Sequence, residues 1–309
     1  MSILDVPVAV DKYLLFQAGI GISANTLLLL SHIFTLLLDH RHKPTDLTIC
    51  HLAFTHIMLL LTVLFLFSAD LFESVNVCND LKCKVLHYTN RVMRGLSICN
   101  TCLLSVIQAI TISPFTSWLA QFKYKSKYFI SYFLPFIWLM CLSFSTITLI
   151  HTVASSNVTQ INLMAFTKYC SFFPINHGIM ALIITLTTCR DVFLVGVMLL
   201  SSVYMMTLLS RHQKRSQHLH STSLSPRSSP EKKATQTILL LVTFFVVMYW
   251  VDFIISSSSM IMWAYDSVIL FVHGFVVNLY ATVSPLVLIG SEKRIINILQ
   301  NIPWKILEF

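Results

Sequence analysis

Charged residues are scarce in this chain. Asp, Glu, Lys and Arg make up 11% of its 309 residues, whereas hydrophobic residues make up 56%; a soluble domain carries about 25% charged residues. So few charges cannot solvate a globule of this size, which argues against a soluble enzyme and against a disordered regulator. The apolar residues also form long runs instead of alternating with polar ones, which argues against a strand-built outer-membrane barrel. The sequence therefore predicts a helical membrane protein.

Glycine is also scarce, with seven residues in all, so a glycine-rich phosphate-binding loop is not expected. The chain contains no H-E-x-x-H, G-x-S-x-G or Walker sequence. Cys99 and Cys102 have C-x-x-C spacing, but they lie in an apolar run with no further metal ligands. We therefore expect a protein that is not an enzyme and that has no metal site and no cofactor.

Seven apolar stretches follow one another along the chain, and each is long enough to cross a bilayer as a helix. They predict an all-α membrane protein, a seven-transmembrane helix bundle that forms a single domain over residues 1–290. The expected spans are residues 13–38, 47–69, 83–113, 128–151, 183–209, 236–262 and 267–290.

Lys and Arg set the expected orientation, because cytoplasmic loops hold an excess of them. With the N-terminus extracellular and the C-terminus cytoplasmic, 14 of the 21 basic residues fall on inner segments. These segments include a low-complexity stretch, residues 211–235, expected to be a flexible cytoplasmic loop, and a short cytoplasmic tail, residues 291–309. The net charge of +8 is then mostly a property of the face that meets anionic membrane lipids, and it does not imply nucleic-acid binding.

Two marks agree with this orientation. Asn157 begins a glycosylation sequon in the second outer loop. Cys78, Cys83 and Cys170 all lie on outer segments, where the compartment is oxidising. We expect a disulfide between Cys83 and Cys170, although the sequence leaves Cys78 open as the alternative partner of Cys170.

Ionisable residues inside the spans are the candidate functional residues, because each costs about 2.5–3.5 kcal/mol at a helix centre unless it is paired or solvated. Arg91 and Arg94 share one face of the third span, and a two-cation face at that depth invites an anionic or polar ligand. The alternative is that both snorkel outward or pair with outer acids such as Asp70. The adjacent Arg190 and Asp191 are further candidate partners. The predicted ligand-binding residues are Asn90, Arg91, Arg94, Ser97 and Asp252.

The chain resembles rhodopsin-like G-protein-coupled receptors in its seven spans, its cysteine pair and Asn25 of SANTLLLL. It departs from most of them in three places. His56 stands in the second span where Asp is usual, Ile107-Gln108-Ala109 replaces Asp-Arg-Tyr, and the seventh span has Ser284-Pro285 without N-P-x-x-Y.

These departures are themselves informative, because four segments resemble vomeronasal type-1 receptors. The segments are RVMRGLSICNTCLLSVIQAITISP (91–114), RDVFLVG (190–196), residues 210–256 and NLYATVSPLVLI (278–289). The resemblance implies a chemosensory receptor at the plasma membrane that detects pheromones or small social odorants and activates a heterotrimeric G protein of the inhibitory class. The alternatives are a bitter-taste-type chemosensory receptor and, from a different class, a small transporter or channel, for which the sequence shows no internal repeat.

A second set of residues is expected to face the G protein, because the orientation puts these residues at the inner ends of the spans. The set comprises Gln108, Arg211, Lys214 and Arg215. The ligand, in contrast, is expected in the outer half of the bundle, where it binds one helix arrangement better than another and so shifts the population.

Overall fold

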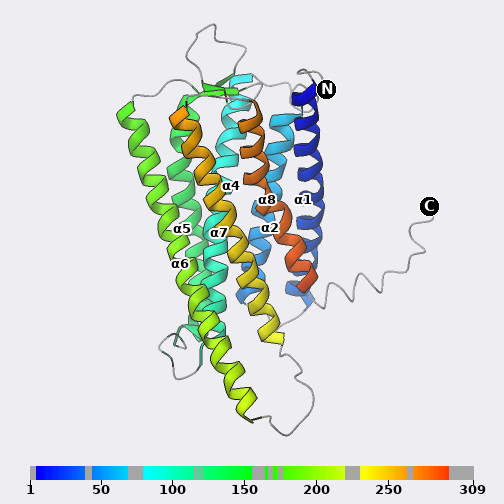
Figure 1. The fold of residues 1–309 in the computed structure, drawn as a ribbon, viewed down its shortest axis with the longest axis vertical. Coiled ribbons are helices and arrows are strands. Elements are labelled where there is room, and N and C mark those ends of the chain that lie inside the picture. The colour runs from blue at the N-terminus through cyan, green and yellow to red at the C-terminus, as the bar shows by residue number, and fades with distance from the viewer. Residues whose placement is uncertain are drawn as a thin grey trace, which may run out of the picture.

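In the part of the chain that the structure describes, seven long helices stand side by side, and three short strands lie at one end of the bundle (Figure 1). The computed structural model describes residues 5–38, 44–68, 79–114, 117, 119, 121–154, 164–165, 170–172, 177–219, 230–262 and 267–291. The helices are α1 (Asp5–Leu38), α2 (Pro44–Phe67), α4 (Asn79–Ile112), α5 (Gln121–His151), α6 (His177–Leu219), α7 (Pro230–Met262) and α8 (Ser267–Ser291). The strands are β1 (Thr152–Ala154), β2 (Met164–Ala165) and β3 (Cys170–Phe172).

Most of the helices are apolar enough to be candidate membrane spans. Six of them, all except α7, contain a stretch long and apolar enough to cross a membrane, and α7 contains a shorter apolar stretch, Thr235–Val251. The expectation of a helical membrane bundle is therefore confirmed, with the small sheet as an addition that the sequence did not indicate.

The segment between the fifth and sixth spans is more helical than expected. We expected a flexible loop over 211–235, but α6 continues to Leu219 and α7 begins at Pro230. Each further residue adds a hydrogen bond to an existing helix at little cost, and proline is well suited to the first turn. Residues 220–229 and the expected tail lie outside the described residues.

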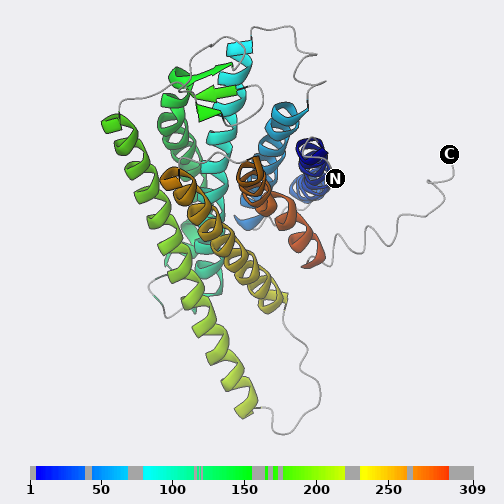
Figure 2. The same cartoon turned by 45° about the horizontal axis from the view of Figure 1, so that its top comes forward.

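Helix α4 is the central element of the bundle. In its most apolar window 83% of residues are buried inside the protein, whereas the value is 22% for α5 and for α6. Both views of the fold show α4 passing through the middle, with α2, α5, α6 and α7 around it (Figures 1 and 2). Polar side chains on α4 therefore meet other helices instead of lipid, and Asn100, Thr101 and Ser105 are fully buried.

A disulfide joins the sheet to the first turns of α4. Strand β3 pairs antiparallel with β1 on one side and β2 on the other, and Cys170 at its start is bonded to Cys83, with 5.7 Å between the two Cα atoms. The expected Cys83–Cys170 pair is confirmed. Cys78 and the sequon at Asn157 lie outside the described residues. Below, the end of the bundle that carries the sheet is called the sheet end.

At α8, a proline inside the helix is compensated by a side chain from α1. Pro285 has no backbone N–H, so the carbonyl of Ala281, four residues earlier, loses its helical donor. The Asn25 side chain donates to this carbonyl at 2.9 Å and to that of Gly21 at 2.7 Å. Asn25 is fully buried, so the bond joins α1 to α8 and satisfies a carbonyl that would otherwise be unpaired in an apolar environment.

Candidate functional site

A cluster of charged side chains lies between α4 and α6 in the half of the bundle near the sheet. Arg91 and Arg94 are one turn apart on α4, about 12 and 17 Å along the helix from Cys83 at 1.5 Å per residue. On α6, Arg190 binds the neighbouring carboxylate of Asp191 through Nε at 2.8 Å and through a terminal nitrogen at 2.7 Å. Arg91 is within electrostatic range of Arg94, Arg190 and Asp191. The two arginines predicted from the sequence thus meet the predicted Arg-Asp pair.

Arg190 reaches across to α4 and α5. Its guanidinium carbon is 5.5 Å from the centre of the Phe144 ring on α5, a cation–π distance. Gly95 on α4 lies beside Arg190. A Cβ atom there would be at an ordinary contact distance from Arg190 Nη1, 3.5 Å, but tightly placed against Cys141 Sγ on α5, at 3.1 Å. Gly95 therefore permits the close packing of α4 against Cys141 on α5, next to Arg190.

The cluster extends to a third helix through Asp191. The Tyr249 hydroxyl on α7 forms a side-chain hydrogen bond with this carboxylate, and Arg94 is within its electrostatic range. Among the described residues, three guanidinium groups therefore surround one carboxylate, where α4, α6 and α7 approach each other. The sequence analysis missed Tyr249; its signal is a hydroxyl in the otherwise apolar run VVMYWV.

The other predicted ligand residues have different positions. Asn90 donates to the Thr62 hydroxyl on α2 at 2.8 Å, and the Ser97 hydroxyl is 2.8 Å from His56 Nε2 on the same helix. Both side chains thus bind α2. Asp252 lies on α7 one turn beyond Tyr249, and its side chain is outside the described residues.

Comparison with known proteins identifies the family. Residues 8–301 match the model of the vomeronasal organ pheromone receptor family. The chain belongs to this family. It is 45% identical to rat vomeronasal type-1 receptor 90 over 295 residues, which cover 95% of this chain and 94% of the relative. It is 43% identical to rat vomeronasal type-1 receptor 94 over 93% of this chain and 87% of the relative, and 39% identical to mouse vomeronasal type-1 receptor 42 over 100% and 93%.

The resemblance inferred from sequence is thereby confirmed. Membership of the vomeronasal organ pheromone receptor family indicates a chemosensory receptor and not an enzyme. Together with the apolar helices it indicates a multi-pass protein of the cell surface. The bitter-taste alternative is not favoured, because these relatives are vomeronasal type-1 receptors.

In this vomeronasal receptor, His56 occupies the middle of a polar network in the core. It is fully buried, its Nε2 is bonded to Ser97 on α4, and its Nδ1 is 3.1 Å from the Ser284 hydroxyl on α8. Tyr280 packs edge-on against the His56 ring and shares a 2.9 Å hydrogen bond with Thr101. The network joins α2, α4 and α8 through hydrogen bonds between buried side chains.

A second histidine joins α2 to α4 and α5. The Trp138 indole donates to His51 Nε2 at 2.7 Å, and His51 Nδ1 is 2.8 Å from the Asn100 side-chain oxygen. Because an indole N–H only donates, Nε2 must accept, so the ring is neutral and its proton on Nδ1 is donated to Asn100. Both histidines hold the bundle together below the charged cluster.

At the end opposite the sheet, Gln108 is not open to solvent. Its amide donates to the Thr235 hydroxyl on α7 at 3.1 Å, and the two side chains are 5% and 0% exposed. Arg211 on α6 is exposed. Lys214 and Arg215 lie on the same helix, and their side chains are outside the described residues. Across the described part of the chain, no three His, Cys, Asp or Glu side chains are grouped so as to hold a metal ion.

Proposed function

We propose that this vomeronasal receptor binds a small pheromone or odorant with an acidic group at the cluster of Arg91, Arg94 and Arg190, and activates an inhibitory-class heterotrimeric G protein at the opposite end. The observation that carries the proposal is the charge balance of the cluster. Three guanidinium groups stand against the single carboxylate of Asp191 among the described side chains.

The proposal requires that the sheet end is extracellular. Two observations support this orientation. The excess of Lys and Arg falls on segments at the opposite end, and the disulfide at the sheet end requires an oxidising compartment. The charged cluster then lies in the outer half of a single seven-helix domain, within reach of a ligand that enters from outside.

An acidic ligand fits this cluster for an energetic reason. The three guanidinium groups are partly buried, and a charge inside the bilayer is costly unless a counter-charge or water offsets the desolvation. Arg190 binds one carboxylate oxygen of Asp191 through two nitrogens. Arg91 and Arg94 add two further positive charges within electrostatic range of the same carboxylate, and this excess of positive charge among the described side chains favours a second anion. A guanidinium binds a planar or tetrahedral oxyanion through two parallel hydrogen bonds, which fixes the orientation of the ligand as well as its affinity.

The remaining predicted residues support the pocket from its flanks. Asn90 and Ser97 bind α2 and hold α4 in register, so in this proposal they position Arg91 and Arg94. Asp252 lies one turn beyond Tyr249 on α7, and we propose that it limits the ligands accepted by adding negative charge to that side.

Helix α7 connects the two ends. Tyr249 meets Asp191 in the cluster, and Thr235, fourteen residues earlier, meets Gln108 at the other end, about 21 Å away along the helix. A ligand that changes the contacts of Asp191 also changes its hydrogen bond with Tyr249, and in this proposal α7 then moves at both ends. Release of Thr235 from Gln108 opens a face to which Gln108, Arg211, Lys214 and Arg215 contribute, and we propose that the G protein binds this face.

The experiment uses cells that express the receptor with a cyclic-AMP reporter. Vomeronasal odorant fractions are separated by anion exchange into acidic and neutral pools, and a flux assay with the same pools runs in parallel. We expect the acidic pool to lower cyclic AMP and pertussis toxin to block the effect. A response confined to the neutral pool would contradict the acidic ligand, and solute flux without G-protein activation would contradict the receptor mechanism.

A further inference from the structure

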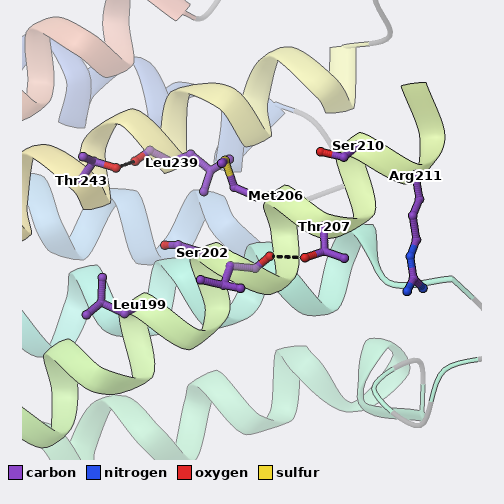
Figure 3. Close-up of a pocket in the computed structure, with 9 residues that line it drawn as sticks. Leu199, Ser202, Met206, Thr207, Ser210, Arg211, Leu239 and Thr243 are labelled. Carbon is purple, nitrogen blue, oxygen red and sulfur yellow. Dashed lines mark hydrogen bonds between the residues drawn. The ribbon is translucent and has the colours of Figure 1, made fainter. Parts of the chain in front are cut away.

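A groove of about 590 Å³ runs between α6 and α7 on the side away from the charged cluster and toward the end opposite the sheet. Figure 2 shows the two helices diverging as they approach this end. Most of the lining comes from α6, between Leu199 and Arg211, and Leu239 and Thr243 contribute from α7 (Figure 3). We propose that the groove binds one acyl chain of an anionic phospholipid, with the headgroup at Arg211.

The length of the groove fits one leaflet. Leu199 and Arg211 are twelve residues apart, which is about 18 Å along α6 at 1.5 Å per residue. Half of the hydrocarbon core of a bilayer is about 15 Å thick. Arg211 is also the last residue of the apolar span Thr185–Arg211, so it stands where hydrocarbon gives way to headgroups.

Three of the four hydroxyl-bearing residues that line the groove use their hydroxyls within their own helix. Ser202, Thr207 and Thr243 each donate to the backbone carbonyl four residues earlier in their own helix, at 2.8 Å. These hydroxyls therefore need no polar partner from a ligand. Val203 and Met206, which also line the groove, are 65% and 60% exposed. In a membrane-spanning helix this exposure is to hydrocarbon, so a lipid tail is the expected contact.

Among the residues that line the groove, Arg211 carries the charge, and it lies at one end of the groove. Arg211 is exposed, and no carboxylate in the described ranges pairs with it; Lys214 and Arg215 follow on the same helix. Anionic lipids are concentrated in the cytoplasmic leaflet, which the proposed orientation places at this end. The inference rests on that orientation, but not on the identity of the pheromone. A zwitterionic lipid satisfies the groove equally well and lacks the net charge that complements Arg211.

The test is lipid retention by the purified receptor, measured by native mass spectrometry with no pheromone and no G protein present. The probes are phosphatidylserine, phosphatidylcholine and the soluble headgroup glycerophosphoserine. Arg211→Ala removes the charge and Val203→Trp fills the groove. Leu200→Trp is the matched control, because Leu200 is 73% exposed on the same helix and does not line the groove.

We expect one phosphatidylserine to be retained in preference to phosphatidylcholine, and excess glycerophosphoserine not to displace it. Arg211→Ala should lower this retention about five-fold, the factor that corresponds to about 1 kcal/mol for one basic residue at an anionic surface. Val203→Trp should lower it by a similar factor or more, and Leu200→Trp should leave it unchanged. Equal retention by the parent and Arg211→Ala, or by the parent and Val203→Trp, would overturn the proposal. So would a receptor dimer that Val203→Trp dissociates, because a second copy would then occupy the groove. Failure here leaves the acidic-ligand proposal intact, since neither variant touches the charged cluster.

Discussion

The side chain of Asn25 on α1 donates to the backbone carbonyl of Ala281 on α8, the carbonyl that Pro285 leaves without its helical donor. The two elements are 256 residues apart in sequence. Proline and asparagine thus act as a pair, since the first creates an unsatisfied acceptor and the second supplies the donor.

This pairing predicts that Asn25→Leu destabilises the receptor, because the Ala281 carbonyl becomes buried without a partner. A loss of about 1–3 kcal/mol is expected for such a group. Pro285→Ala restores the backbone N–H, so the double variant Asn25→Leu/Pro285→Ala should recover part of the loss. The measurement is thermal unfolding of the purified receptor. Additive effects of the two substitutions would show that they do not act on the same carbonyl.

Gly95 predicts a local effect on the charged cluster. In Gly95→Ala the new Cβ lies 3.1 Å from Cys141 Sγ, so Cys141 on α5 must shift at a cost of about 1–3 kcal/mol, whereas Arg190 Nη1 at 3.5 Å is at an ordinary contact distance. We expect the concentration for half-maximal response to rise about five-fold or more. Gly196→Ala on α6 is the control, because a Cβ there meets nothing within 4 Å. Equal responses in the two variants would show that the packing of α4 against Cys141 on α5 does not affect ligand binding.

The hydrogen bond between Gln108 and Thr235 is expected to limit the activity of the receptor in the absence of ligand. Thr235→Val keeps the shape of the side chain and removes the acceptor, so the bond of about 1 kcal/mol that holds α4 and α7 together is lost. Ligand-independent G-protein activation should rise about five-fold if this bond favours the inactive arrangement. Thr111→Val is the control, since among the described residues that hydroxyl donates to the Ile107 carbonyl within α4. An unchanged basal signal in Thr235→Val would show that this bond has no role in activation.

The disulfide predicts which cysteine is required at the cell surface. Cys83 and Cys170 are 87 residues apart, and closing a loop of this length restricts the unfolded chain by about 4–5 kcal/mol in the chain-entropy model. Cys83→Ser, Cys170→Ser and the double variant should lose surface expression to the same extent. Cys189, an exposed free thiol, should tolerate replacement by Ser. Normal expression of Cys83→Ser would indicate that the bond contributes little to folding.

Much of the fold could be predicted from sequence because the bilayer imposes a simple rule. Backbone polar groups must be satisfied within each segment, so apolar runs of sufficient length become helices, and the seven runs all did. Helix ends were predicted less well, since α6 continues to Leu219 in a polar stretch where hydropathy gives no signal. The partner of Cys170 was open between two cysteines because only the position of α4 beneath the sheet brings Cys83 to β3.

The candidate site was predictable in its charges and not in its geometry. Arg91, Arg94, Arg190 and Asp191 stood out because ionisable residues are costly in a membrane. The direction in which neighbours such as Asn90 and Ser97 point depends on how α4 is rotated against α2, and no single helix pattern contains that information. Tyr249 and Thr235 were missed for the same reason. The hydrogen-bond partner of a hydroxyl on an apolar helix depends on which helix packs against it.

The central claim is that Arg91 and Arg94 bind the acidic group of the ligand, and dose–response curves at equal surface expression test it most directly. The variants are Arg91→Ala and Arg94→Ala, with Lys84→Ala as a control that removes a cation from the same helix nearer the sheet end. A lost charge-assisted hydrogen bond of about 1.5–3 kcal/mol corresponds to an increase of about 10- to 150-fold in the half-maximal concentration. We predict this increase for both arginine variants and no change for Lys84→Ala; curves that coincide with the parent for both arginine variants would contradict the account.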